Sequence, residues 1–196
     1  TGAFDDLEAI ADACAAHGTW LHVDAAHGGS ALFSARHRER LRGIARVDSL
    51  AWDPHKMMLM PLAAGMVLVR DAAGLDRAFA QSAPYLFHQQ QGEPALDLGP
   101  RSFQCSRRGD ALKVWASILR YGQPGIAAFY DYLCDLTEAF HEMVEAHPHF
   151  RSLHVPETNI LCFRYTGGEA VAAMDDAARD EFNRALRERY NASGEG

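Results

Sequence analysis

The sequence has few cysteines, no long apolar run and fewer basic than acidic side chains. Its four cysteines, Cys14, Cys105, Cys134 and Cys162, are scattered over 196 residues and form no C-x-x-C pair. In a chain of this length, such spacing indicates reduced thiols in a cytoplasmic protein and no disulfide framework, and we assign no metal site. No apolar run approaches the length of a membrane span, and no charged-then-apolar signal peptide opens the chain.

The charge balance also excludes one class of partner. There are 26 acidic and 19 basic side chains, which give a formal net charge of −7 and disfavour a nucleic-acid partner. Hydrophobic residues make up 48% and charged residues 23%, a balance typical of a globular protein with a buried core. The chain begins without methionine and ends at Ser193-Gly194-Glu195-Gly196 with no closing element, so we expect a piece of a longer protein.

Helix and strand signals alternate in the first half of the chain. Asp5 or Asp6 can cap a helix that carries an apolar i, i+3, i+4, i+7 stripe and stops at Gly18. Strands are expected at residues 19–23, 48–52 and 65–69, with a basic, exposed helix beginning at Ser34 between the first two. Because helical crossovers connect parallel strands, this order predicts an α/β fold with a mostly parallel sheet flanked by helices.

The second half of the chain differs in composition and in its hydrophobic pattern. Residues 83–100 are rich in Gln, Gly and Pro, lack periodicity and are long for a structureless connection. Loops of this length inside compact domains are often functional lids. A helix from about Asp110 should break at residues 122–125, and a longer helix, a strand at 159–165 and a last helix at 176–190 should follow. We place a domain boundary near Gly122, so that residues 1–122 belong to a large domain and residues 123–196 to an incomplete, smaller α+β domain.

Two short segments each follow a predicted strand directly. The first reads His-Val-Asp-Ala-Ala-His-Gly-Gly over residues 22–29, and the second reads Trp-Asp-Pro-His-Lys over residues 52–56. In open α/β sheets, ligands bind in the crevice outside the carboxyl ends of the strands. We therefore expect both segments to line a ligand site.

A carboxylate and a lysine at such strand ends suit pyridoxal phosphate. The cofactor needs an amine to form an imine, a role that fits Lys56, and an anion beside its pyridine nitrogen, a role that fits Asp24. Ala26 points the same way as Asp24 and can lie beneath the ring, while His55 can donate to phosphate or assist proton transfer. Taken singly, Asp24 reads as a turn former, Lys56 as a solvated charge and residues 28–29 as a tight turn. The two segments together favour the cofactor.

The same residues carry a family resemblance. Lys56 follows Asp24 by 32 positions within Asp-Pro-His-Lys, and further stretches match along the chain: His55-Lys56-Met57-Met58, Tyr85-Leu86-Phe87, and Gln104-Cys105 followed by Arg107, Asp110, Lys113 and Trp115. The sequence resembles the group II pyridoxal-phosphate-dependent decarboxylases, most closely the glutamate and cysteine sulfinate branch and its bacterial relatives. This resemblance implies the fold of the PLP-dependent transferases (fold type I), with residues 1–122 as the C-terminal part of the cofactor-binding domain.

The resemblance also implies roles for individual residues. Lys56 would be the Schiff-base lysine, Asp24 the partner of the pyridine nitrogen, and Ala26 the residue packed against the ring. His55 would contact the cofactor phosphate and active-site protons. Tyr85 would be the mobile-loop tyrosine that protonates the carbanion left by loss of carbon dioxide. In the family this loop reaches the neighbouring subunit's site, so a homodimer is implied.

Some positions depart from the family or lie outside the chain. Asp53 is a further cofactor-contact candidate, but Asn is frequent at this position, and an ionised Asp cannot donate to phosphate and would repel it unless it turns away. The ring-stacking histidine and most of the phosphate loop would precede Thr1, and the arginine that binds the substrate carboxylate would follow Gly196. Without the family spacing, Tyr85 beside Leu86 and Phe87 would read as an aromatic anchor of the loop.

Together these observations predict decarboxylation of an L-amino acid, with an acidic substrate such as glutamate or cysteine sulfinate favoured. Alternative substrates are 2,4-diaminobutyrate and aromatic amino acids. Another fold type I enzyme, such as a sphingosine-phosphate lyase, a cysteine desulfurase or an aminotransferase, would keep the cofactor and break a different bond. A non-enzymatic protein with a dead site is a third alternative, which the presence of Asp24, His55, Lys56 and Tyr85 disfavours.

Overall fold

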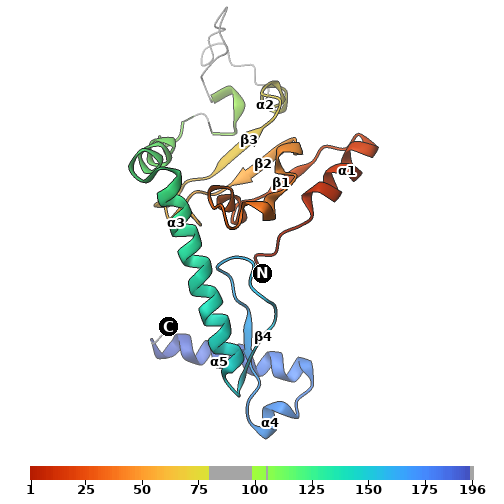
Figure 1. The fold of residues 1–196 in the computed structure, drawn as a ribbon, viewed down its shortest axis with the longest axis vertical. Helices are drawn as coiled ribbons and strands as arrows, with labels where there is room; N and C mark the ends of the chain where they lie inside the picture. Colours follow the sequence, from red (N-terminus) through yellow and green to blue (C-terminus); the bar gives the residue numbers. More distant parts are fainter. Residues whose placement is uncertain (80–98, 105, 195–196) are drawn as a thin grey trace, which may run out of the picture. The chain divides into compact units, whose positions relative to one another are not determined.

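The computed structural model describes residues 1–79, 99–104 and 106–194 (Figure 1). Contacts divide the chain into one unit of Phe4–Asp131 and another of Thr1–Ala3 with Tyr132–Gly196. The first unit contains α1 (Leu7–His17), β1 (His22–Asp24), η1 (Gly28–Phe33), η2 (Arg38–Leu41), η3 (Ile44–Arg46), β2 (Ser49–Trp52), β3 (Met66–Val69), α2 (Ala73–Ala78) and η4 (Gly99–Arg101). Helix α3 (Ala111–Ala146) begins in this unit, and the second unit adds β4 (Phe150–Ser152), β5 (Phe163–Tyr165), α4 (Glu169–Ala172) and α5 (Asp176–Ser193).

The first unit is built on a three-stranded sheet in the order β1-β2-β3, drawn in orange and yellow in Figure 1. Strands β1 and β2 are parallel, as expected, and the segment between them makes the crossover. Strand β3 is antiparallel to β2. The expected parallel pairing is therefore wrong for this third strand, because residues 53–65 form turns and no helix, and so return the chain in the opposite direction.

Helix α1 has the ends that its sequence predicts. The Asp6 side chain accepts a hydrogen bond from the Ala9 amide at 3.1 Å, and Gly18 ends the helix in the left-handed conformation with φ 61°. One side of the helix contributes to a buried cluster with the first two strands: Ala11, Leu21, Ala25, Val47 and Leu50. Burial of these side chains attaches α1 to the sheet.

The basic helix expected from Ser34 is absent, and η2 and turns take its place. The buried Ser34 hydroxyl accepts hydrogen bonds from the Arg36 and His37 amides at 3.1 and 3.3 Å, which satisfies these amides outside an α-helix. Gly43 then takes φ 95° where a Cβ would lie 2.8 Å from the Glu8 amide nitrogen. The Ser34 hydroxyl competes with backbone carbonyls for these amides, and the backbone approach at Gly43 requires a conformation that is not helical. Together they explain why this arginine-rich segment does not form a helix.

Helix α3 has a kink at the predicted break. Gly122 has φ 61° and ψ −178°, and Pro124 lacks the amide that a continuous helix would use. The boundary expected near Gly122 coincides with this kink, and as a domain boundary it stays a prediction.

In the second unit, β4 and β5 pair antiparallel, and the Asp175 side chain caps α5 through the Ala178 amide at 2.8 Å. Among the described residues, no helix combines the length and apolar character that a membrane span requires.

Candidate active site

The two motif segments meet at one edge of the sheet. Asp24, the last residue of β1, lies opposite Ala51 in the parallel register, and the Ala25 amide donates to the Ala51 carbonyl at 2.9 Å. Beyond the strands, the Asp53 amide donates to the Ala26 carbonyl at 3.1 Å. The backbone therefore holds the residues after β1 against those after β2, at the carboxyl ends where open sheets bind ligands.

Asp24 presents its carboxylate to solvent at this edge. Its Oδ1 accepts from the Ala26 amide at 3.0 Å, which is the local turn contact that a single aspartate commonly makes. Among the described residues, Oδ2 has no hydrogen-bond partner. Ala26 itself is half-buried. Asp24 thus combines a turn-forming oxygen with a second oxygen that can accept from a ligand.

Lys56 is paired with a carboxylate. Its Nζ lies 2.9 Å from Asp53 Oδ2, and the two side chains are 39% and 26% exposed. A partly exposed pair of this kind contributes at most about 1 kcal/mol to stability, so it orients the amine without locking it. Asp53 directs its charge to Lys56, and its role as a cofactor contact stays a prediction.

His55 is oriented by the backbone of Ala64. Its Nδ1 lies 2.8 Å from the Ala64 carbonyl oxygen and 3.2 Å from the Ala64 amide nitrogen. Nε2 has no partner among the described residues. The neighbouring Pro54 and Met57 are fully buried, so they anchor the backbone on both sides of the His55-Lys56 pair. This arrangement leaves Nε2 for a ligand or a proton.

Residues 28–29, which taken singly read as a tight turn, open η1 and make a close approach to Trp52. Gly29 is buried, and a Cβ on it would lie 2.8 Å from Trp52 Cδ1. The Trp52 indole donates to Ser30 Oγ at 3.1 Å and packs against Phe33 with ring centroids 5.7 Å apart. The glycine therefore lets the β1 segment pack directly on the last residue of β2.

The sequence motifs imply no role for Lys113, although this residue contacts the loop that follows Lys56. Its Nζ is 2.9 Å from Asp110 Oδ1 and donates to the Pro61 and Ala63 carbonyls at 3.0 and 2.5 Å. The i, i+3 spacing of Asp110 and Lys113 indicates a local ion pair. No pattern in the sequence indicates carbonyl acceptors some fifty positions earlier.

Tyr85 falls within residues 80–98 and so lies outside the described residues. Its role stays a prediction. The remaining site candidates, Asp24, Ala26, Asp53, His55 and Lys56, all lie in the first unit.

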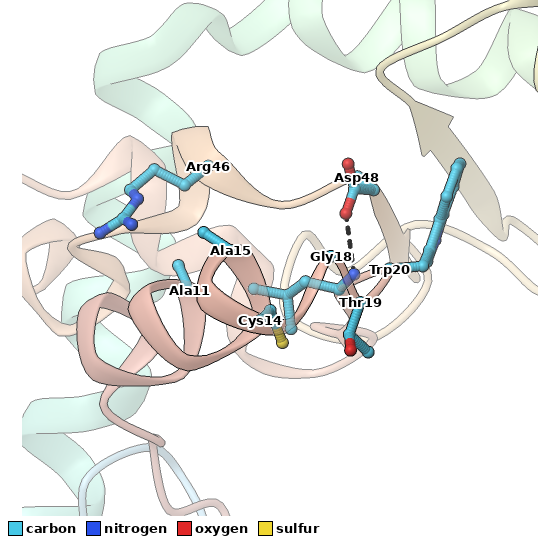
Figure 2. A pocket seen from close by; sticks show the side chains of 9 residues that line it. Ala11, Cys14, Ala15, Gly18, Thr19, Trp20, Arg46 and Asp48 are labelled. Atoms are coloured by element: carbon cyan, nitrogen blue, oxygen red, sulfur yellow. Dashed lines mark hydrogen bonds between the residues drawn. The ribbon is translucent and has the colours of Figure 1, made fainter.

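A pocket of about 360 Å³ lies elsewhere on the first unit (Figure 2). The dashed line in Figure 2 is the hydrogen bond from the Leu21 amide to Asp48 Oδ2, 2.8 Å long. These two residues precede β1 and β2, whereas Asp24 ends β1 and Lys56 follows β2. The pocket is lined by Ala11, Cys14, Ala15, Gly18, Thr19, Trp20, Leu21, Arg46 and Asp48, and is therefore separate from the candidate site.

Comparison with known proteins identifies the family. Residues 1–166 match the family described as the pyridoxal-dependent decarboxylase conserved domain. Acidic amino acid decarboxylase GADL1 from Bos taurus is 42% identical over 166 residues, which are 84% of this chain and 32% of the relative. Cysteine sulfinic acid decarboxylase from Rattus norvegicus is 43% identical over 164 residues, which are 83% of this chain and 33% of the relative.

Solved structures agree with this match. Mouse CSAD superimposes with a TM-score of 0.74 at 39% identity, covering 83% of this chain and 34% of that one. Oryza sativa TDC with PLP and tryptamine gives a TM-score of 0.88 at 31% identity, covering 97% of this chain and 39% of that one. The predicted fold type I class is confirmed by these neighbours. The chain spans about a third of the length of the curated relatives it matches. With the family profile matching most of its residues, including both motif segments, this chain belongs to the pyridoxal-dependent decarboxylase family.

Proposed function

We propose that the protein is a pyridoxal-phosphate-dependent decarboxylase of L-amino acids, with an acidic amino acid as its substrate. The observation that carries this proposal is the pair of adjacent strand ends that presents the Asp24 carboxylate and the Lys56 amine at one edge of the sheet. These two groups fit the cofactor, because one Asp24 oxygen accepts no hydrogen bond from the described residues and the Lys56 side chain is partly exposed. Family membership supports the same conclusion.

Each residue has a task that follows from its chemistry. Bound pyridoxal phosphate supplies an electron sink for the electrons that the departing carboxylate leaves behind. Lys56 would hold the cofactor covalently, Asp24 would keep the pyridine nitrogen protonated, and Ala26 would lie against the ring. His55, held through Nδ1, would use Nε2 toward the phosphate or a transferred proton. Asp53 would stand at the edge of the site as the charge partner of Lys56.

Two further parts of the proposal rest on the resemblance alone. Tyr85 would deliver the proton that replaces the lost carboxylate, from a loop that closes over the site and excludes water. This loop would reach the site of a second subunit, so the protein would act as a homodimer. The scattered cysteines support a cytoplasmic location.

The substrate is proposed from the relatives. The names of the two curated relatives described above specify acidic amino acids and cysteine sulfinic acid, which carry a second negative group. This favours glutamate, aspartate or cysteine sulfinate. The similarity to Oryza sativa TDC with tryptamine, at 31% identity, supports an aromatic substrate as the second candidate.

The test uses the full-length protein and the fact that this chain has two lysines, Lys56 and Lys113. The protein is loaded with pyridoxal phosphate and its visible absorbance is recorded, then borohydride reduction fixes the cofactor and peptide mapping locates it. We expect a cofactor band, a modified Lys56 and an unmodified Lys113. Lys56→Ala should abolish both the band and carbon dioxide release from an acidic amino acid.

The outcomes separate the alternatives. A folded protein that shows no cofactor band would refute the enzyme proposal and favour the dead-site alternative. A band on Lys56 with a new keto acid and no carbon dioxide would indicate an aminotransferase. Carbon dioxide release from an aromatic or a diamino substrate, with none from glutamate, aspartate or cysteine sulfinate, would keep the reaction and replace the substrate class.

A further inference from the structure

Residues 61–63, in the loop that follows Lys56, are exposed and are held to helix α3 by a polar contact. Pro61, Leu62 and Ala63 are exposed, so burial contributes little to their placement. The Lys113 ammonium contacts three acceptors, the carbonyls of Pro61 and Ala63 and the Asp110 carboxylate, which matches its three N–H donors. An ammonium satisfied in this way holds two carbonyls of the loop at fixed distances from helix α3.

The residue next to Lys113 packs under the same loop. Val114 is buried in a cluster that also contains Met58, Met60, Ala64 and Ile126. Helix α3 therefore contacts residues 58–64 in two ways, with an apolar contact from Val114 and a polar one from Lys113. Since apolar packing is not directional, the polar contact is what sets the orientation of the exposed carbonyls.

The position of residues 61–63 in turn affects the orientation of His55 and Lys56 in the candidate site. Ala64 follows Ala63 directly, and it either accepts a hydrogen bond from His55 Nδ1 through its carbonyl, at 2.8 Å, or donates one to Nδ1 through its amide, at 3.2 Å, according to the tautomer of the ring. The His55 amide also donates to the Ala64 carbonyl at 3.4 Å. A displacement of residues 61–63 would therefore move Ala64, then the His55 ring, and with it the backbone of Lys56.

We propose that Lys113 is a positioning residue that fixes residues 61–64 and thereby aims His55 and Lys56. The assignment rests on the proposed function, because the orientation of His55 and Lys56 affects activity only if Lys56 reacts with a cofactor. A misplacement of about 1 Å at a reacting group can cost roughly a hundredfold in rate. Lys113 touches neither the cofactor nor the substrate in this assignment.

The test compares Lys113→Met with Lys113→Arg and Asp110→Asn in the full-length protein. Arg120→Met, which removes an exposed cation from the same stretch of α3, is the matched control. Amide hydrogen exchange of the cofactor-free protein is the first measurement. Lys113→Met should speed exchange of residues 59–66 about tenfold and leave β1 and β2 unchanged. Asp110→Asn retains both carbonyl contacts and should give a smaller local increase, and Lys113→Arg should restore most of the protection.

The second measurement is the rate at which the cofactor band forms, which Lys113→Met should slow roughly tenfold and Arg120→Met should not change. Unchanged exchange of residues 59–66 in Lys113→Met would overturn the assignment. If that variant does not fold, Lys113→Gln, whose shorter and neutral side chain removes the ammonium contacts, decides the matter, and a normal exchange pattern in it would also overturn the assignment. A wild-type protein without a cofactor band would refute the proposed function instead, so the two failures are distinguishable.

Discussion

Substitution of Gly29 by alanine tests how the two motif segments pack. An alanine Cβ at this position would lie 2.8 Å from Trp52 Cδ1 and 3.1 Å from Cγ. Carbon atoms pack best at about 3.5–4.0 Å, so the indole would have to move by about 0.7 Å or more. It is held by the hydrogen bond to Ser30 Oγ and by packing against Phe33, so this movement is opposed.

The expected cost follows from these contacts. Overpacking of a buried site destabilises by about 1–3 kcal/mol, and a broken Trp52–Ser30 hydrogen bond would add about 1 kcal/mol. Guanidinium unfolding followed by circular dichroism measures the change in the free energy of unfolding. Gly109→Ala is the matched control, because a Cβ at Gly109 meets nothing within 4 Å. Its stability should be unchanged or slightly raised, since alanine restricts the unfolded chain.

A double-mutant cycle identifies the cause. Trp52→Phe replaces the indole with a smaller ring, so it should reduce the cost of Gly29→Ala by about 1 kcal/mol. Equal costs in the two backgrounds would show that the clash with Trp52 is not responsible. The reasoning is refuted if Gly29→Ala differs from Gly109→Ala by less than about 0.5 kcal/mol.

Three other substitutions test separate parts of the first unit. Met57→Ala removes a side chain that is 1% exposed and should lower the free energy of unfolding by about 2–5 kcal/mol in the same denaturation assay. Asp6→Ala removes the acceptor of the Ala9 amide and should cost about 1 kcal/mol, with α1 exchanging its amide protons faster. Arg77→Met should raise the pKa of the Asp71 carboxyl, which the Arg77 hydrogen bond holds below its ordinary value, as an NMR titration of that carboxyl would show. A carboxyl whose pKa is lowered in the folded state stabilises the fold at a pH above its pKa in the unfolded state, and this stabilisation is lost as the pH falls. The variant should therefore lose less stability on acidification than the wild type.

Local signals in the sequence were sufficient for several features of the first unit. The Asp6 cap, the Gly18 stop and the break at Gly122 depend on contacts within a few residues, so the sequence around each position determines them. The placement of Asp24 and Lys56 at the ends of parallel strands followed from the same kind of signal, because the carboxyl ends of parallel strands lie at one sheet edge. The motif spacing then indicated the family that the comparisons confirmed.

Other features depend on residues that are far apart in the chain. The return of β3 in the antiparallel direction and the close approach of Gly43 to Glu8, which opposes a helix after Ser34, were decided by the surrounding tertiary structure, which local propensity does not describe. The sequence by itself determined which residues stand at the two strand ends and to which family they belong. Only the tertiary structure decided that Gly29 packs on Trp52 and that Lys113 holds residues 61–63, because each contact requires the folded backbone to bring its two partners together.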